Sequence, residues 1–162
     1  MKILIRPARI EDAEDILQAH FNSVHGTGAK FYSKEICHEW SPIVSPKRIK
    51  GVTDALASGE EIMFVAEIEG KIVGFSSIVP KDSELRAVYV DPKFGGKGVG
   101  KMLLGQVEQE ARNRGLQKLV MPASLSAEAF YKSQGYVAID RIVHILGSGK
   151  RMPAVKMEKA LN

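Results

Sequence analysis

The sequence predicts a single α+β domain over residues 1–162, with a mixed, mostly antiparallel sheet of about seven strands flanked by helices. Three strand-like segments, 62–68, 71–79 and 84–90, follow one another with only turn residues between them, which is typical of an antiparallel meander. A helical segment and another short strand then follow. Such a β-α-β unit is parallel and right-handed, so the sheet is expected to be mixed.

The residues before the meander predict one strand and three helices. Ser33 is well placed to cap a short helix, and Ser45 followed by Pro46 is a favourable N-cap and first-turn pair for another. Apolar residues between Ala13 and Val24 recur at helical spacing, so a longer helix precedes both. We therefore expect a strand at 3–5 and helices at about 11–25, 34–40 and 46–58.

The sequence also predicts where the later segments turn. Glu69-Gly70 is a two-residue hairpin signal inside the meander, and Gly147-Ser148-Gly149 predicts a closing hairpin. Gly115 is a C-cap candidate for the helix that follows the meander. We expect this helix to be followed by a strand at 118–121, a helix at 126–134 and strands at 136–146 and 152–157.

The composition, with 44% hydrophobic and 26% charged residues, is that of an ordinary globular protein. No apolar run reaches the roughly 20 residues of a membrane span, so no membrane partner is expected. Cys37 is the single cysteine, which rules out an intrachain disulfide. The first seven residues are too few and too charged for a signal peptide, so we expect a cytoplasmic protein.

The net charge of +4 does not predict a nucleic-acid partner, because lysines and arginines are interspersed with acids along the chain. The stretch 44–50 is basic but contains no aromatic residue, and we expect it to be a solvated face. Cys37, His38 and His25 lack a recognised metal-ligand spacing, so we expect no metal.

The segment Phe94–Met102 holds four glycines and two lysines between a strand and a helix, an arrangement that suits phosphate binding. Gly95 to Lys101 fit the P-loop pattern G-x-x-x-x-G-K, but Met102 replaces the Ser or Thr that holds magnesium. The dinucleotide pattern G-x-G-x-x-G also fails, because Leu103 occupies the position of the third glycine.

The segment instead resembles motif A of the GNAT superfamily of N-acetyltransferases, in which a strand ending in Val-x-Pro leads to a loop that closes with Gly-x-Gly. Val90-Asp91-Pro92 and Gly98-Val99-Gly100 match these two parts. A second family signature, A-x-x-F-Y-x-x-x-G-Y, matches Ala127 to Tyr136. Gly95 departs from the pattern, since the family has Arg or Gln there. The resemblance covers nearly the whole chain and implies the GNAT fold, with a splay between the fourth and fifth strands.

The resemblance implies acetyl-CoA (coenzyme A carrying an acetyl group) as co-substrate. Val88 and Val90 would line the strand edge to which the pantetheine arm hydrogen-bonds, as an added strand would. Ser124 stands where the family often has an Asn that contacts the same arm. The loop residues expected to hold the pyrophosphate, mainly through backbone N–H groups, are Gly95, Gly96, Lys97, Gly98, Val99, Gly100 and Lys101.

The resemblance also supplies two catalytic candidates. Tyr131 would be the general acid that protonates the leaving thiolate of coenzyme A. Glu84 would be the base that accepts the proton of the attacking amine, directly or through water. Both residues have plainer interpretations, Tyr131 as a packing residue between helix and sheet and Glu84 as an exposed carboxylate beside a turn.

The amine acceptor is the part that the sequence specifies least. In the superfamily, the segment between the first two helices helps to wall the acceptor site, and here His25, Tyr32 and Trp40 are the candidate contacts. The same aromatic residues could equally form a packed cluster under a loop. His144 is expected to be an ordinary strand residue.

The expected function is transfer of an acetyl group from acetyl-CoA to the primary amine of a small molecule or peptide, by direct attack. An acyl-CoA-binding regulatory module without turnover, on the same fold, is the alternative, and a P-loop nucleotide binder is a third. The chain is expected to be a monomer or a homodimer.

Overall fold

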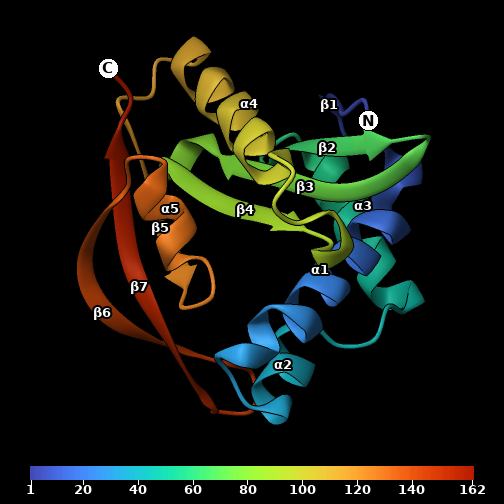
Figure 1. Cartoon of the computed structure of the whole chain (residues 1–162), viewed down its shortest axis with the longest axis vertical. Coiled ribbons are helices and arrows are strands. Elements are labelled where there is room, and N and C mark those ends of the chain that lie inside the picture. Colours follow the sequence, from blue (N-terminus) through green and yellow to red (C-terminus); the bar gives the residue numbers. More distant parts are fainter.

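The computed structural model describes every residue from 1 to 162 and contains one seven-stranded sheet with helices on both faces (Figure 1). The strands lie in the order β1-β2-β3-β4-β5-β7-β6, and only β4 and β5 are parallel neighbours, so the expected mixed sheet is confirmed. The strands are β1 (Leu4–Pro7), β2 (Ile62–Ile68), β3 (Lys71–Val79), β4 (Glu84–Val90), β5 (Lys118–Ser124), β6 (Val137–Ile145) and β7 (Arg151–Ala160). The α-helices are α1 (Ala13–Gly26), α2 (Lys34–Trp40), α3 (Pro46–Ser58), α4 (Val99–Asn113) and α5 (Glu128–Ser133).

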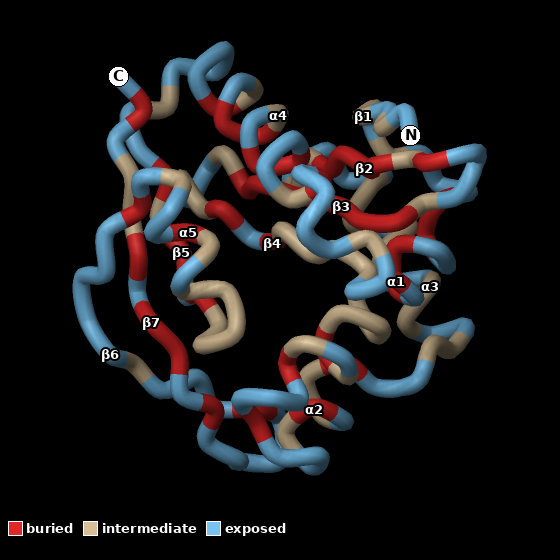
Figure 2. The backbone as a smooth tube through the Cα atoms, in the orientation of Figure 1, coloured by how far each residue is buried: buried red, intermediate tan, exposed pale blue.

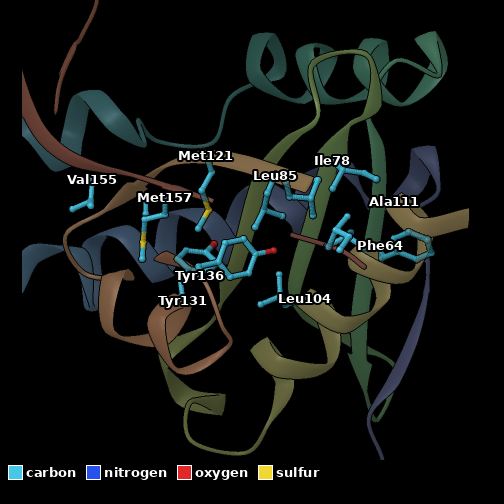
Figure 3. Close-up of a cluster of buried hydrophobic side chains, with 14 residues drawn as sticks. Phe64, Ile78, Leu85, Leu104, Ala111, Met121, Tyr131, Tyr136, Val155 and Met157 are labelled. Atoms are coloured by element: carbon cyan, nitrogen blue, oxygen red, sulfur yellow. The ribbon is translucent and has the colours of Figure 1, made fainter. Parts of the chain in front are cut away.

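The side chains of β2 show how one sheet supports two hydrophobic layers. Met63 and Val65 pack in a buried cluster with Ile16 of α1. Phe64, between them, belongs to the larger cluster that contains Leu104 of α4 (Figure 3). Successive strand side chains point to opposite faces of a sheet. Helices α1 and α3 therefore cover one face, and α4 covers the other.

The local signals in the sequence produce the elements that they predicted. The Ser33 Oγ accepts a hydrogen bond from the Ile36 N–H at 3.2 Å, and the Ser45 Oγ accepts one from the Arg48 N–H at 3.3 Å, so both serines are N-caps. Glu69-Gly70 has positive φ angles of 51° and 78°, as a tight hairpin turn requires. The three meander strands have the predicted bounds.

Strand β5 is longer than the sequence suggested. The predicted strand ended at Met121, one residue before Pro122, and proline weakens a strand. In the structure β5 continues through Pro122 to Ser124, since its other edge pairs with β7 over its whole length. The long β5–β7 ladder therefore overrides the local effect of one proline.

The outer strand, β6, is mostly exposed over its nine residues (Figure 2). Its exposed apolar side chains are Val137, Ile139, Val143 and Ile145. An unpaired strand edge can accept a second copy of the chain, and the expected monomer or homodimer stays a prediction. None of the helices combines enough length with enough apolar character to cross a lipid bilayer.

A charged cluster fixes the start of α1 to the sheet. The Arg6 guanidinium on β1 donates to both carboxylate oxygens of Asp12, at 2.8 and 3.0 Å, and to Glu67 on β2 at 2.6 Å. The Arg9 N–H also donates to Asp12, at 2.7 Å. These hydrogen bonds, led by those from Arg6, hold the pKa of the buried Asp12 below its ordinary value of 3.8 although burial acts in the opposite direction.

Asp12→Asn should lower the free energy of unfolding at pH 7 by about 1–3 kcal/mol, the usual cost of losing a charged, part-buried hydrogen-bond partner. A lowered folded-state pKa contributes stability above the unfolded value, and this contribution disappears as pH falls through the folded value. The difference between wild type and variant should therefore shrink below about pH 3.8. Urea unfolding at a series of pH values measures it, and a difference that is constant with pH would contradict the role of Asp12.

Candidate functional site

The two parallel strands at the centre of the sheet separate almost as soon as they meet. Strands β4 and β5 share one register pair, Glu84 with Val120, and the Val120 N–H donates to the Ser83 carbonyl at 2.9 Å. Two residues later along β5, the backbone nitrogen on this same side belongs to Pro122, which has no N–H to donate. The ladder cannot continue there, and a gap opens between the strands.

A β-bulge in β4 adds to this opening. Leu85 pairs with Ile78 and Ala87 pairs with Ser77, so Arg86 is an extra residue with no partner on β3. A bulge bends its strand and redirects the extra side chain. The exposed Arg86 side chain lines several clefts around β4.

The first cleft, which we name the loop cleft, runs from the gap to the glycine loop and has a volume of about 330 Å³. Five of the predicted cofactor residues line it: Val88, Val90, Gly95, Gly100 and Ser124. Pro92, Ala127 and Phe130, from the two family signatures, also line it, as does Trp40. The lining residues without any signal in the sequence are Ser23, Thr27, Lys30, Tyr89 and Ser126. The Ser124 hydroxyl lies 2.9 Å from that of Ser126.

The loop cleft ends at the N-terminus of α4. Gly98 is the N-cap of this 15-residue helix, has a φ of 84° and offers no side chain to cap the first N–H groups. The backbone N–H groups of the first turn, at Val99, Gly100 and Lys101, are therefore available to an anion, and the helix dipole favours negative charge there. Lys97 and Lys101 are exposed beside this terminus.

Gly95, the departure from the family pattern, has an ordinary extended backbone with φ of −67°. A Cβ atom at this position would lie 3.3 Å from the Pro92 carbonyl oxygen, which is close but requires only a small shift. The glycine at 95 is therefore not required by backbone conformation, in contrast to Gly98.

The second cleft, named the hairpin cleft, lies between β4 and the β6–β7 hairpin and has a volume of about 290 Å³. Glu84, Arg86 and Tyr89 border it on the β4 side, and Trp40 and Ser124 are shared with the loop cleft. His144, which was expected to be an ordinary strand residue, also lines it. The remaining lining residues are Pro122, Met152 and Ala154.

Glu84 is half-buried at the start of β4, where the gap begins. Its carboxylate accepts a hydrogen bond from the Arg86 Nε at 2.8 Å, and Arg86 also lies 4.0 Å from the carboxylate of Glu61. One face of the Glu84 carboxylate is thus bound to a cation, while the residue itself borders the hairpin cleft. The arrangement can hold an ammonium group or accept a proton from it.

Two neighbouring tyrosines in the core use their hydroxyls differently (Figure 3). Tyr136 donates to Glu108 at 2.8 Å, and Glu108 also accepts from Lys159 at 3.0 Å, so this phenol belongs to a closed structural network. Tyr131 lines the gap between β4 and β5, and its hydroxyl has no hydrogen-bond partner in the protein. Burial raises the pKa of Tyr131, which keeps the phenol protonated at neutral pH.

Tyr89 borders the loop cleft, the hairpin cleft and the gap between β4 and β5, although the sequence pointed only to its neighbours Val88 and Val90. Its ring lies 4.4 Å from that of His20 and 5.5 Å from that of Phe75, and burial raises its pKa to about 12. Strand alternation was a usable signal, because a residue between two valines on one face must point to the opposite face.

The third cleft, named the α3 cleft, lies on the α1–α3 side of the sheet and has a volume of about 270 Å³. His20 lines it, and its Nδ1 lies 2.8 Å from the Ser41 hydroxyl. Burial, with a smaller contribution from the charge of Arg48, lowers the pKa of His20 to about 4, so the ring is neutral at pH 7. Arg48, which belongs to the stretch expected to be a solvated face, is half-buried and also lines this cleft.

Two predicted acceptor contacts lie outside the three clefts. The Tyr32 hydroxyl donates to the Pro153 carbonyl at 2.5 Å and accepts from the Leu125 N–H at 2.8 Å, so it ties the α2 region to β5 and β7. His25 stacks on Phe21 with ring centroids 4.0 Å apart and contacts the Ser41 carbonyl at 2.8 Å. Their acceptor roles stay predictions without a place in these clefts, whereas Trp40 borders two of them.

The single cysteine has the surroundings of a packing residue. Cys37 is buried in a cluster with Val24 and Tyr32, and burial raises the pKa of its thiol. A raised pKa makes a thiol less reactive as a nucleophile. No group of three or more His, Cys, Asp or Glu side chains is arranged to hold a metal ion.

Comparison with known families identifies this architecture. Residues 29–161 match the family model described as the acetyltransferase (GNAT) domain, which is most of the chain. The chain belongs to the GNAT family. The resemblance seen in motif A and in the Ala127–Tyr136 signature is thereby confirmed, and so is the expected fold.

Individual relatives of this GNAT protein are distant. An uncharacterized N-acetyltransferase of Methanocaldococcus jannaschii is 28% identical over 82% of the chain, and the chain spans only 59% of that relative's length. A spermidine N(1)-acetyltransferase of Thermoplasma acidophilum is 28% identical over 72% of the chain and 74% of the relative. A solved GCN5-related N-acetyltransferase of Rhodopseudomonas palustris has a TM-score of 0.87 at 28% identity, covering 99% of this chain and 96% of its own.

Gly98→Ala should lower the free energy of unfolding by about 1–2 kcal/mol, because alanine is strained at a positive φ. Gly95→Ala is the matched control, three residues earlier in the same loop, and should change stability by no more than about 0.5 kcal/mol. Urea unfolding of the two variants measures both values. Equal losses would show that the loop does not have the described backbone.

Proposed function

We propose that the protein is an acetyl-CoA-dependent N-acetyltransferase that acts on a primary amine by direct attack. The observation that carries this proposal is the position of Tyr131. Its unpartnered phenol faces a gap in the sheet, with the loop cleft beside it leading to the N-terminus of α4 and the hairpin cleft beside it containing Glu84. A donor and an acceptor entering by the two clefts would meet at this gap.

Acetyl-CoA would occupy the loop cleft. The first-turn N–H groups of α4 would bind its pyrophosphate, with Lys97 and Lys101 nearby to add positive charge. The pantetheine arm would extend along the edge of β4 at Val88 and Val90, where the lost β4–β5 ladder leaves backbone groups free. Ser124 borders the same path from the β5 side.

The protein's own residues would then move two protons. A protonated amine cannot attack a thioester, so Glu84, directly or through water, would accept a proton from it. The nitrogen loses a second proton after it has attacked, and this proton would pass to solvent. The Tyr131 phenol would donate a hydrogen bond, and finally a proton, to the sulfur as the thiolate leaves. The raised pKa of Tyr131 ensures that this proton is present throughout the neutral range.

The cofactor can be tested first by ligand-induced stabilisation. Acetyl-CoA at 100 times its Kd should raise the free energy of unfolding by about 2.7 kcal/mol, which shifts the melting temperature by several degrees. Dephospho-CoA and Mg-ATP serve as comparison ligands in the same thermal-shift assay. A shift with Mg-ATP alone would support a P-loop nucleotide binder and would overturn the proposed cofactor.

Tyr131→Phe should lower kcat by about 100-fold or more while the Kd for acetyl-CoA stays unchanged, because a general acid acts mainly in the transition state. Free-thiol release in the presence of an amine panel measures kcat. Tyr136→Phe is the matched control, since it removes a phenol that is bound to Glu108, away from the gap. It should cost stability and leave kcat near the wild-type value.

Two outcomes would contradict this mechanism. Unchanged kcat in Tyr131→Phe would remove the phenol from the chemistry. Tight binding of acetyl-CoA with no turnover across the panel would instead favour a regulatory module that binds acyl-CoA.

A further inference from the structure

Arg48 is an unusual arginine in this structure. It is half-buried on α3, and its guanidinium donates to the backbone carbonyl of Pro42 but forms no ion pair. By contrast, Arg6 pairs with two carboxylates and Arg86 with Glu84 and Glu61. A guanidinium has five N–H donors, so most donors of Arg48 have no protein acceptor. Burial without a carboxylate lowers its pKa, in line with a cation that lacks a counter-charge.

The surroundings of Arg48 form a mostly apolar pocket. The α3 cleft is lined mostly by aliphatic and aromatic side chains from α1, α3 and the sheet, with His20 and Arg48 on the helical side. Its other charged lining residues are Glu61 and Arg86, which lie 4.0 Å from each other. His20 is neutral at pH 7 because its pKa is lowered to about 4, so it does not compete with Arg48 for an anion. The apolar residues of the lining are Ile16, Leu17, Val52, Ala55, Met63, Phe75 and Ala87.

The α3 cleft adjoins the hairpin cleft, since Arg86 and Tyr89 line both. Arg86 is already neutralised by Glu84 at 2.8 Å and is near Glu61 at 4.0 Å. This group of three carries a formal charge of −1 at the junction. Arg48 carries a separate charge of +1. A molecule that spans the two clefts would therefore meet a negative end and a positive end.

We propose that the amine acceptor carries an anionic group, and that Arg48 binds this group in the α3 cleft. The proposal rests on the proposed N-acetyltransferase function and specifies its acceptor. The amine would lie toward Glu84, and a carboxylate or similar oxyanion would lie on the planar donor fork of Arg48. The apolar lining suits a hydrocarbon body between the two ends. A polycationic amine such as spermidine would place a second ammonium group against an unneutralised guanidinium.

The test uses pairs of an acid and its amide: leucine and leucinamide, methionine and methioninamide, and 4-aminobutyrate and its amide. Each kcat/KM is expressed per unprotonated amine, because amidation also lowers the pKa of a neighbouring amine. Free-thiol release at saturating acetyl-CoA gives kcat/KM for each, with spermidine as the polycation. In at least one pair the carboxylate should be the better substrate by about 10-fold or more, the usual value of a charged hydrogen bond. Equal kcat/KM within every pair, or a preference for spermidine, would overturn the proposal.

Arg48→Gln should lower kcat/KM for the preferred carboxylate by about 10- to 100-fold and change that of its amide by less than about threefold. The ratio within one variant cancels any loss of folded protein. Lys47→Gln is the matched control, because Lys47 is an exposed cation one residue away and lines none of the three clefts. An Arg48 variant that loses acid and amide alike would show a structural role and overturn the assignment.

Failure of the proposed function would look different. If the protein binds acetyl-CoA but acetylates neither the acids nor the amides, the proposed transferase activity is refuted. The role of Arg48 is then tested separately, by measuring the Kd of each acid and each amide for protein saturated with coenzyme A. Tighter binding of the carboxylate member, lost in Arg48→Gln, would support it, and equal Kd values within each pair would overturn it.

Discussion

The single β4–β5 pair at Glu84 and Val120 is the constraint on which the rest of the site depends. If this ladder continued, the backbone N–H and C=O groups on that edge of β4 would be hydrogen-bonded to β5, and the clefts around it would close. Pro122 removes the next donor on that side, and the bulge at Arg86 bends the opposing strand. The sheet tolerates the missing hydrogen bonds because β5 is held on its other edge by β7 and because both faces are covered by packed helices.

The helices on the two faces of the sheet line different clefts around the same gap. On one face α4 packs its apolar residues on β2–β4 and presents an uncapped N-terminus to the loop cleft. On the other face α1 and α3 bring His20 and Arg48 to the α3 cleft. Residues of β4 alternate between these faces, so Val88 and Tyr89, adjacent in sequence, serve opposite sides. The proposed donor side of the site thus offers mainly backbone groups, whereas the proposed acceptor side offers side chains.

This difference explains how much the sequence could predict. Caps such as Ser33 and Ser45, the hairpin at Glu69-Gly70 and the start of a helix after the glycine loop depend on neighbours within a few residues, and they were predicted correctly. The acceptor side depends on which residues of α1 and α3 meet β4, and local sequence gave little sign of Arg48. His25 was named where His20 lines the cleft, although His20 lies one helical turn from the buried Ile16 and shares its face. Tyr32 was named because it is aromatic, but its hydroxyl joins segments far apart in the chain.

The most direct test of this account is a crystal structure of the protein with acetyl-CoA bound. We predict that the sulfur lies within about 3.5 Å of the Tyr131 hydroxyl, within the reach of a hydrogen bond to sulfur, and that the pyrophosphate contacts the first-turn N–H groups of α4. A ligand bound outside the gap, or a sulfur more than about 6 Å from the phenol with the β4–β5 ladder closed, would contradict it.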